Sequence, residues 1–343
     1  MKKLSLVLVV VLVLGITIGA GAQDLYFGTS IRSLDNPYHA QWKEGAEIYA
    51  EEVGLLDNHR TLLCEGSDEK QVDDIRSLIA SSNGNVVFNI DPNTAPNVQP
   101  ILELLEEEEI YFVTNWNKPA ELNPTDYKYW VAHIGYDNFN SGYQTAKVLF
   151  DSIGGEGKIL AIEGMLANTA NQQRVEGLNQ ALEEYSDIEL VESRPADWSR
   201  SQAYNVTQNL LLAYPDVKGI WAANDAMALG VIEALREQGL AGQIPVTGTD
   251  GISEAFQAIR NGEMVATAVN NAHWQGGIGL AIAHAAETGE INPEELSQEK
   301  ANWVYNAAIV TQDNVDEYVS NFVENVPEYD FTQYWVEDPA VKE

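Results

Sequence analysis

The chain has 343 residues, and its 52 Asp and Glu against 19 Lys and Arg give a formal net charge of -33. So negative a surface repels nucleic acid and anionic lipid headgroups, which excludes proteins that bind either one through charge. The single cysteine, Cys64, excludes a disulfide within the chain, and its apolar surroundings TLLCEG predict a small buried side chain.

The first 22 residues are typical of a secretory signal peptide. Lys2 and Lys3 precede an apolar stretch that Gly15 bounds, and the small residues Ala20 and Ala22 follow. This order predicts export and cleavage after Ala22. No cysteine lies near that point, so we expect no lipid anchor. The mature chain of about 320 residues is long enough for two domains.

Short apolar stretches alternate with helical patterns along the rest of the chain. We expect strands at 25–31, 60–65, 85–90, 110–115, 129–135, 157–164, 188–193, 217–223, 244–250, 264–270 and 303–310. Strict alternation of strands and helices predicts an α/β fold with parallel sheets covered by helices on both faces. The pattern runs twice, on either side of WVAHIGYDN (130–138), which indicates two similar halves.

The stretch WAANDAMALG (221–230) places two polar residues where an expected strand gives way to a helix. Asn and Asp both cap helices, because their side chains accept hydrogen bonds from the free N–H groups of the first turn. In open α/β sheets, ligands also bind beyond the carboxyl ends of the strands. We therefore expect Asp225 to serve mainly as the cap and Asn224, at the strand tip, to contact a ligand.

Other expected strands also end in side chains that could contact a ligand. Amides, a carboxylate, a guanidinium, a histidine and aromatic rings occur there, namely Asn36, Tyr38, His39, Asn115, Trp116, Arg174, Trp198, Asp250 and Asn270. Each has a structural alternative, since Asn-Pro can start a helix and Asp-Gly forms turns. Together they suit a neutral polyhydroxyl ligand, because amides, carboxylates and Arg bind hydroxyls and flat rings cover the apolar face of a sugar.

No pattern in the sequence assembles a catalytic or metal centre. The five histidines lack metal-ligand spacing, and no Gly-x-Ser-x-Gly nucleophile motif is present. The stretch IGGEGKI (153–159) lacks the preceding strand, and the Ser or Thr after the Lys, that a phosphate loop needs. We therefore expect no enzymatic activity, no metal and no cofactor.

Five stretches in this order resemble the type I periplasmic sugar-binding proteins, the ribose- and galactose-binding group of bacterial ABC importers. They are NPYHAQWKEGAE, RVEGL, AANDAMALG, TGTDG and VTQDNVDEY. The resemblance implies two similar doubly wound parallel-sheet lobes joined by three chain crossings, near residues 133–136, 269–271 and 304–309. The first lobe would contain residues 23–134 and 271–306, and the second lobe residues 135–270 and 307–343.

The resemblance also implies a ligand site between the two lobes. One wall would carry Asn36, Tyr38 and His39, the other would carry Arg174, Trp198, Asn224 and Asp250, and Asn270 would lie at a crossing. Ribose binders commonly have an Asp-Arg pair after the fourth strand, whereas this chain has Asn115 and Trp116 at the matching positions. The expected ligand is therefore a pentose, a hexose or a related polyol.

The function that the resemblance implies is a periplasmic, monomeric subunit that captures a monosaccharide between closing lobes and delivers it to an ABC permease. The alternative is a periplasmic sugar sensor that docks on a chemoreceptor or a histidine kinase. Sugar-responsive repressors share the fold, but here a signal peptide stands where their DNA-binding helix-turn-helix would lie. A carbohydrate-active enzyme is the weaker class, since it would need a carboxylate pair at a defined separation.

Overall fold

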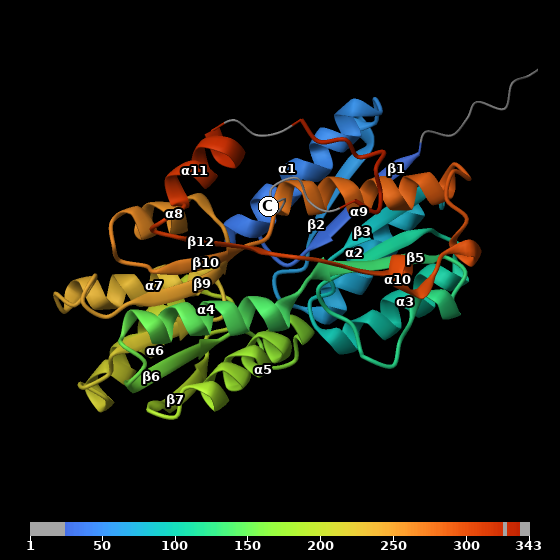
Figure 1. Ribbon diagram of the computed structural model, residues 1–343. Coiled ribbons are helices and arrows are strands. Elements are labelled where there is room, and N and C mark those ends of the chain that lie inside the picture. Colours follow the sequence, from blue (N-terminus) through green and yellow to red (C-terminus); the bar gives the residue numbers. More distant parts are fainter. Residues whose placement is uncertain (1–24, 325–327, 337–343) are drawn as a thin grey trace, which may run out of the picture.

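The computed structural model describes residues 25–324 and 328–336. Within them the chain forms two lobes, each a six-stranded sheet flanked by helices (Figure 1). The expected signal peptide, residues 1–22, lies outside the described residues. In those ranges no helix combines the length and the apolar character needed to span a bilayer.

The sheet of the first lobe is parallel throughout and has the strand order β11-β5-β4-β3-β1-β2. Its strands are β1 (Tyr26–Ile31), β2 (His59–Leu63), β3 (Val86–Ile90), β4 (Phe112–Asn115), β5 (Trp130–Tyr136) and β11 (Asn302–Tyr305). Its helices are α1 (Pro37–Glu52), α2 (Asp68–Ser81), α3 (Val98–Glu107), α9 (Ala272–Glu287) and the short α10 (Gln298–Ala301). Strands β3 and β4 are buried along their whole length, as expected where helices cover both faces of a sheet.

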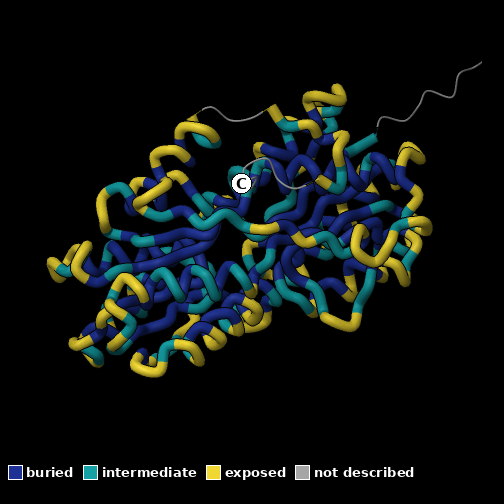
Figure 2. Tube along the Cα trace, in the orientation of Figure 1, coloured by how far each residue is buried: buried dark blue, intermediate teal, exposed yellow. Residues whose placement is uncertain are grey.

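The sheet of the second lobe has the order β12-β10-β9-β8-β6-β7, and all its neighbouring pairs are parallel except β10–β12. Its strands are β6 (Gly157–Glu163), β7 (Ile188–Pro195), β8 (Gly219–Ala222), β9 (Val246–Asp250), β10 (Ala266–Val269) and β12 (Ala308–Thr311). Its helices are α4 (Asn138–Ser152), α5 (Thr169–Glu184), α6 (Arg200–Ala213), α7 (Asp225–Glu237), α8 (Ser253–Arg260) and α11 (Val315–Val319). The inner strands of both sheets are buried and dark blue in Figure 2, whereas the outer strands β2, β7, β11 and β12 are partly exposed.

The chain passes between the sheets at three places, from β5 to α4, from β10 to α9 and from β11 to β12. The expected single strand at 303–310 is thus two strands, because its first half pairs with β5 and its second half with β10 of the other sheet. The crossings are tied to one another. Asp137 N donates to Tyr305 O at 2.8 Å, and Asn271 N donates to the Tyr136 hydroxyl at 3.0 Å.

Glycines allow one closely packed helix pair in each lobe. A Cβ on Gly45 of α1 would lie 1.8 Å from the carbonyl oxygen of His273 in α9. A Cβ on Gly142 of α4 would lie 2.1 Å from the carbonyl oxygen of Arg174 in α5. No larger residue fits at either contact, so these glycines set the helix spacing. In the second lobe this spacing also fixes where Arg174 stands relative to the sheet.

The C-terminal segment 328–336 packs on the first lobe. Helix α11 still belongs to the second lobe, where Asp316 pairs with Arg260 at 2.7 Å. Phe331, however, is 1% exposed and lies against Tyr49 of α1 and the bare backbone of Gly277 in α9. The expectation that residues 307–343 belong to the second lobe is therefore wrong for this segment, because Phe331 packs against α1 and α9 and Trp335 against Trp303 of β11, all in the first lobe. Figure 1 shows the course of the segment.

We predict that Phe331→Ala lowers the free energy of unfolding by about 3–5 kcal/mol, the usual cost of emptying a buried phenylalanine site. Urea denaturation followed by far-UV circular dichroism measures the effect. Leu212→Ala is the control, because Leu212 is 80% exposed and its truncation should change stability by less than about 0.5 kcal/mol. Equal stability of the two variants would show that the segment is not docked on the first lobe.

Candidate ligand site between the lobes

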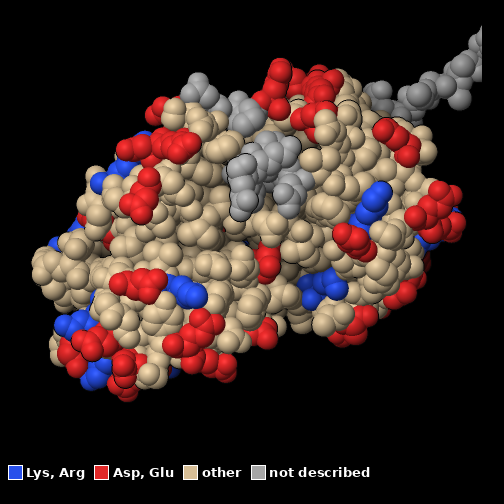
Figure 3. Space-filling view, viewed as in Figure 1, with Lys and Arg blue, Asp and Glu red and all other residues tan. Residues whose placement is uncertain are grey.

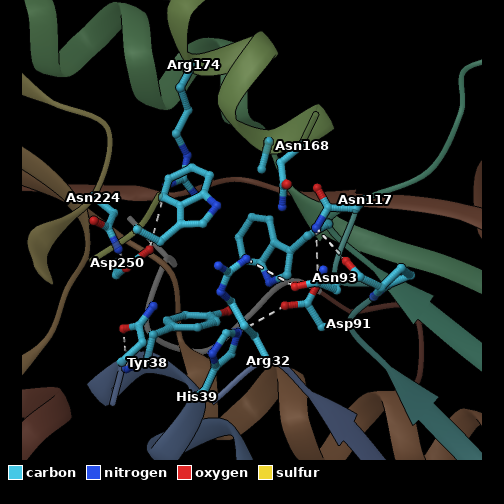
Figure 4. A pocket seen from close by; sticks show the side chains of 15 residues that line it. Arg32, Tyr38, His39, Asp91, Asn93, Asn117, Asn168, Arg174, Asn224 and Asp250 are labelled. Atoms are coloured by element: carbon cyan, nitrogen blue, oxygen red, sulfur yellow. Dashed lines mark hydrogen bonds and ion pairs between the residues drawn. The ribbon is translucent and has the colours of Figure 1, made fainter. Parts of the chain in front are cut away.

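A pocket lies between the lobes, at the edge where the strands of both sheets reach their carboxyl ends (Figure 4). The space between its atoms, open solvent at its mouth included, measures about 490 Å³. The first lobe lines it from the ends of β1, β3 and β4 and the start of α1, and the second lobe from the start of α5 and the loops after β7, β8 and β9. The lining residues are Arg32, Asn36, Tyr38, His39, Asp91, Pro92, Asn93, Trp116, Asn117, Asn168, Ala170, Arg174, Trp198, Asn224 and Asp250.

A buried ion pair forms the second lobe's side of the pocket. Arg174 Nη1 lies 3.8 Å from Asp250 Oδ1, and both side chains are almost fully buried. The guanidinium also donates from Nε to Asn138 Oδ1 at 3.0 Å and from Nη1 to Ala223 O at 2.8 Å. Burial raises the pKa of Asp250, while Arg174 and the amide of Asn224 oppose that shift. The pair is neutral as a whole and offers both a donor and an acceptor to a ligand.

Asp250 stands on an unusual backbone. Its φ is 131°, a conformation that L residues rarely adopt, and Gly251 after it has φ 75°. Such backbone strain persists only where surrounding contacts hold it, and it is common at ligand sites. Here Asn224 Nδ2 donates to Asp250 Oδ2 at 3.1 Å and fixes the carboxylate at the pocket wall.

The helix cap expected of Asp225 is made by Asn224, which also lies at the pocket as expected. Asn224 is the helix cap, since its Oδ1 accepts from Met227 N at 3.1 Å, and it lines the pocket as well. Asp225 is fully buried and does not cap α7. Its carboxylate instead accepts from Gly251 N at 2.7 Å, Ile252 N at 3.1 Å and the Thr267 hydroxyl at 2.8 Å. Asp225 therefore holds the end of β9 against β10, directly behind Asp250.

Two tryptophans supply the flat surfaces of the pocket. The Arg174 guanidinium lies 5.5 Å from the ring of Trp116 and 5.6 Å from that of Trp198. Both residues have positive φ, 58° and 62°, a backbone conformation that residues other than glycine seldom adopt. Trp198 lies over Gly164, where a Cβ would be 2.2 Å from the indole. Rings in this position can cover the C–H face of a sugar.

A histidine and a carboxylate face each other on the first lobe's side. His39 Nε2 lies 3.0 Å from Asp91 Oδ2, and His39 Nδ1 lies 3.2 Å from Ser33 O. Sequence reasoning missed Asp91, although it directly follows the strand at 85–90 and the strand-end rule would have found it. Arg32, Asn93, Asn117 and Asn168 were also missed.

The structure brings eight of the ten expected site residues together in the pocket. Asn115 is not among them. It is fully buried, and its Nδ2 donates to Asn89 Oδ1 at 2.6 Å and Ile90 O at 3.1 Å, so it joins β4 to β3. Asn270 lies next to Asp250 at the second crossing, where its N donates to Asp250 O at 3.1 Å, but it does not line this pocket. In the part of the chain that is described, no three His, Cys, Asp or Glu side chains gather where they could hold a metal ion.

Comparison with known proteins gives concordant matches. Residues 27–291 match the periplasmic binding protein domain. The chain is 29% identical over 293 residues to the ribose import binding protein RbsB of Haemophilus influenzae, covering 84% of this chain and 95% of that protein. It is 30% identical over 279 residues to the D-allose-binding periplasmic protein of Escherichia coli, covering 80% and 88%.

A solved structure also superposes on the whole architecture. The twin-arginine translocation pathway signal protein from Burkholderia phytofirmans is 38% identical to this chain, with a TM-score of 0.88. The match covers 91% of this chain and 96% of that one.

We predict that Asp225→Ala destabilises the unliganded protein more than Asn224→Ala does. Losing the Asn224 cap should cost about 0.5–2 kcal/mol. Removing the Asp225 carboxylate leaves the partly buried Gly251 N and two buried donors without their acceptor, and each buried donor costs about 1–3 kcal/mol. Urea denaturation compares the two variants with Ser67→Ala, which removes the cap of α2 outside the pocket. An Asp225→Ala variant as stable as Ser67→Ala would contradict the role assigned to Asp225.

We predict a second, pH-dependent signature of Asp225. Burial and the neighbouring Asp250 raise its pKa, so the folded protein holds this proton more firmly than the unfolded chain does. Stability must then fall as the pH rises from the ordinary aspartate value of about 3.9 through the raised value. Asp225→Asn cannot ionise, so its free energy of unfolding should fall less than that of the wild type between about pH 4 and pH 8. Parallel stability curves for the two proteins would exclude the raised pKa.

Proposed function

The chain belongs to the periplasmic binding protein family, and from this premise we propose that it is the solute-binding subunit of an ABC importer. In this role it captures a monosaccharide between its two lobes and delivers it to the permease in the membrane. The relatives described above are named as binding proteins for ribose and D-allose. We propose, accordingly, that this chain is not an enzyme and not a sensor in its own right.

The observation that carries the proposal is the composition of the pocket. It combines a buried Arg174–Asp250 pair with amides and two indole rings, drawn from both lobes. Charge-assisted hydrogen bonds from the pair bind hydroxyls, and each contributes about 1.5–3 kcal/mol. The outer surface is rich in Asp and Glu (Figure 3), which disfavours an anionic ligand and suits a neutral one.

Lobe closure supplies the mechanism. The residues that line the pocket come from both lobes, so a sugar that contacts both sets stabilises the closed arrangement of the lobes over an open one. Direct contacts between the lobes add to this. Ala95 N donates to Ala167 O at 3.2 Å, and the Thr169 hydroxyl donates to Lys118 O at 2.9 Å. The three hydrogen-bonded crossings are the hinge about which the lobes would move.

The pocket favours a pentose, a hexose or a related polyol. The residues after β4 that line the pocket are Trp116 and Asn117, and neither carries the charge of the Asp-Arg pair common in ribose binders. One side of the bound sugar would therefore meet an indole face and an amide oxygen instead of two charged groups. Asn270 remains a candidate contact, since it lies beside Asp250 with both side-chain polar atoms buried.

Delivery to a permease requires the protein on the outer side of the inner membrane. We propose export through the signal at residues 1–22, release without a lipid anchor, and a monomer in the periplasm. Docking on a chemoreceptor or histidine kinase would be an additional use of the same closed form.

A thermal-shift screen tests the proposal. D-Ribose, D-allose and other pentoses and hexoses, with deoxysugars and polyols, are each added to the purified protein, and the melting temperature is recorded. A bound sugar raises it by mass action, by an amount that grows with the ratio of ligand concentration to Kd. Titration calorimetry then gives the Kd. No shift with any sugar or polyol would contradict the proposed function.

We predict that Asp250→Asn weakens binding of the sugar by more than about tenfold, because it removes the charged acceptor that pairs with Arg174. Titration calorimetry measures the change, and circular dichroism checks that the variant is folded. Asp216→Asn is the matched control, since it removes the same charge from an exposed site on the same lobe. Unchanged affinity in Asp250→Asn would make Asp250 a structural residue of the turn.

A further inference from the structure

Two amide oxygens in the pocket have no hydrogen-bond partner among the residues that the structure describes. They are Oδ1 of Asn117 and Oδ1 of Asn168. The two residues are 3% and 5% exposed, and both line the pocket. Asn117 belongs to the first lobe and Asn168 to the second, and Figure 4 shows both on the side of the pocket away from Asn224 and Asp250. A buried acceptor without a donor is costly, so these oxygens call for a partner.

The orientation of Asn117 is fixed by its neighbours. Its Nδ2 donates to Asp91 Oδ1 at 3.3 Å and to Pro92 O at 3.0 Å. Both of these atoms are acceptors, so exchanging the amide nitrogen and oxygen would place oxygen against oxygen. The free atom of Asn117 must therefore be the carbonyl oxygen, and it can only accept a hydrogen bond.

Asn168 holds the N-cap position of α5, yet its side chain makes no capping bond. The other two N-cap asparagines of the pocket behave differently. Asn36 accepts from Tyr38 N and Asn224 accepts from Met227 N, each at 3.1 Å. Asn is among the best capping residues, yet the Asn168 side chain faces the pocket and makes no capping bond. This orientation points to a hydrogen-bond partner inside the pocket.

Asn168 also sits where the two lobes touch. Its chain neighbours Ala167 and Thr169 make the two hydrogen bonds to the first lobe, with Ala95 N and Lys118 O. The position of Asn168 relative to Asn117 is thus set by lobe closure. A ligand that bonds both oxygens would be held only while the lobes are closed.

We propose that Asn117 and Asn168 form a second contact for the sugar, across the pocket from the Arg174–Asp250 pair, and that each accepts a hydrogen bond from the ligand. A hydroxyl has one proton and can satisfy one acceptor, so the ligand must present two hydroxyls on this side. The site thereby selects a sugar or polyol that presents two hydroxyls on this side and rejects one that lacks either. This inference rests on the proposed function and names the chemistry that the pocket selects.

The test uses Asn168, because its side chain has no other bond to lose. The probe is the sugar that most raises the melting temperature of the wild type in a screen that includes D-ribose, D-allose and xylitol. By titration calorimetry, Asn168→Ala should bind it about tenfold more weakly, while the melting temperature without ligand stays unchanged. Asn168→Asp keeps an acceptor oxygen and should lose less affinity than Asn168→Ala. Asn292→Ala, an exposed cap outside the pocket, should bind as the wild type does.

Monodeoxy analogues of the same sugar identify the bond. The wild type should bind one of these analogues about tenfold more weakly than the parent sugar. The Asn168→Ala variant should bind that analogue and the parent sugar equally well, because the variant has already lost the hydrogen bond that the analogue cannot make. Two results would overturn the inference while the wild type still binds sugar. One is an unchanged affinity in Asn168→Ala, and the other is that, for every analogue, the losses of affinity from the substitution and from the missing hydroxyl are additive. Failure of every sugar to bind the wild type would instead overturn the proposed function, and the inference with it.

Discussion

In a parallel sheet every strand presents its carboxyl end at the same edge, and the two sheets of this protein turn these edges toward one common space. Everything polar in the pocket follows from that constraint. The segments that follow β1, β3 and β4 in one lobe, and those at the ends of β7, β8 and β9 in the other, converge there. The hydrogen-bonded crossings keep the two edges opposed.

This arrangement buries the charged guanidinium of Arg174, and its loss of hydration is the main electrostatic cost in the pocket. Water is replaced by the Asn138 oxygen, the Ala223 carbonyl, the Asp250 carboxylate and two indole faces. Asp225 lies directly behind and is satisfied by backbone N–H groups and a threonine hydroxyl. Polar contacts from α4, β8, β9 and β10 offset part of the desolvation cost of these charges and hold the second lobe's side of the pocket in a prearranged geometry.

The first wall is held in a different way. Asp91 faces His39 and receives a bond from Asn117, and the amide of Asn115 ties β4 to β3 beneath them. The lobe also receives the C-terminal segment, whose Phe331 fills the space above Gly277. This segment lies beyond the three crossings in the chain, so its packing on the first lobe adds a further contact between the C-terminal part of the chain and that lobe.

The sequence by itself determined the architecture and most of the pocket. Alternating strands and helices specify parallel sheets, and polar residues at strand ends must then gather at one edge, as Asn224 and Asp250 do. The same rule, applied after β3, would have added Asp91. What the tertiary structure decided is the direction of individual side chains. Asn115 ends its strand as expected, but its amide turns toward Asn89. Asn224 and Asp225 are adjacent, yet the cap goes to the first because the second finds Gly251, Ile252 and Thr267, residues 26 to 42 positions away. Phe331 joins the distant lobe for the same reason. Capping rules and periodicity are local, whereas a buried polar or aromatic group goes to the strongest partner that the folded chain brings within reach.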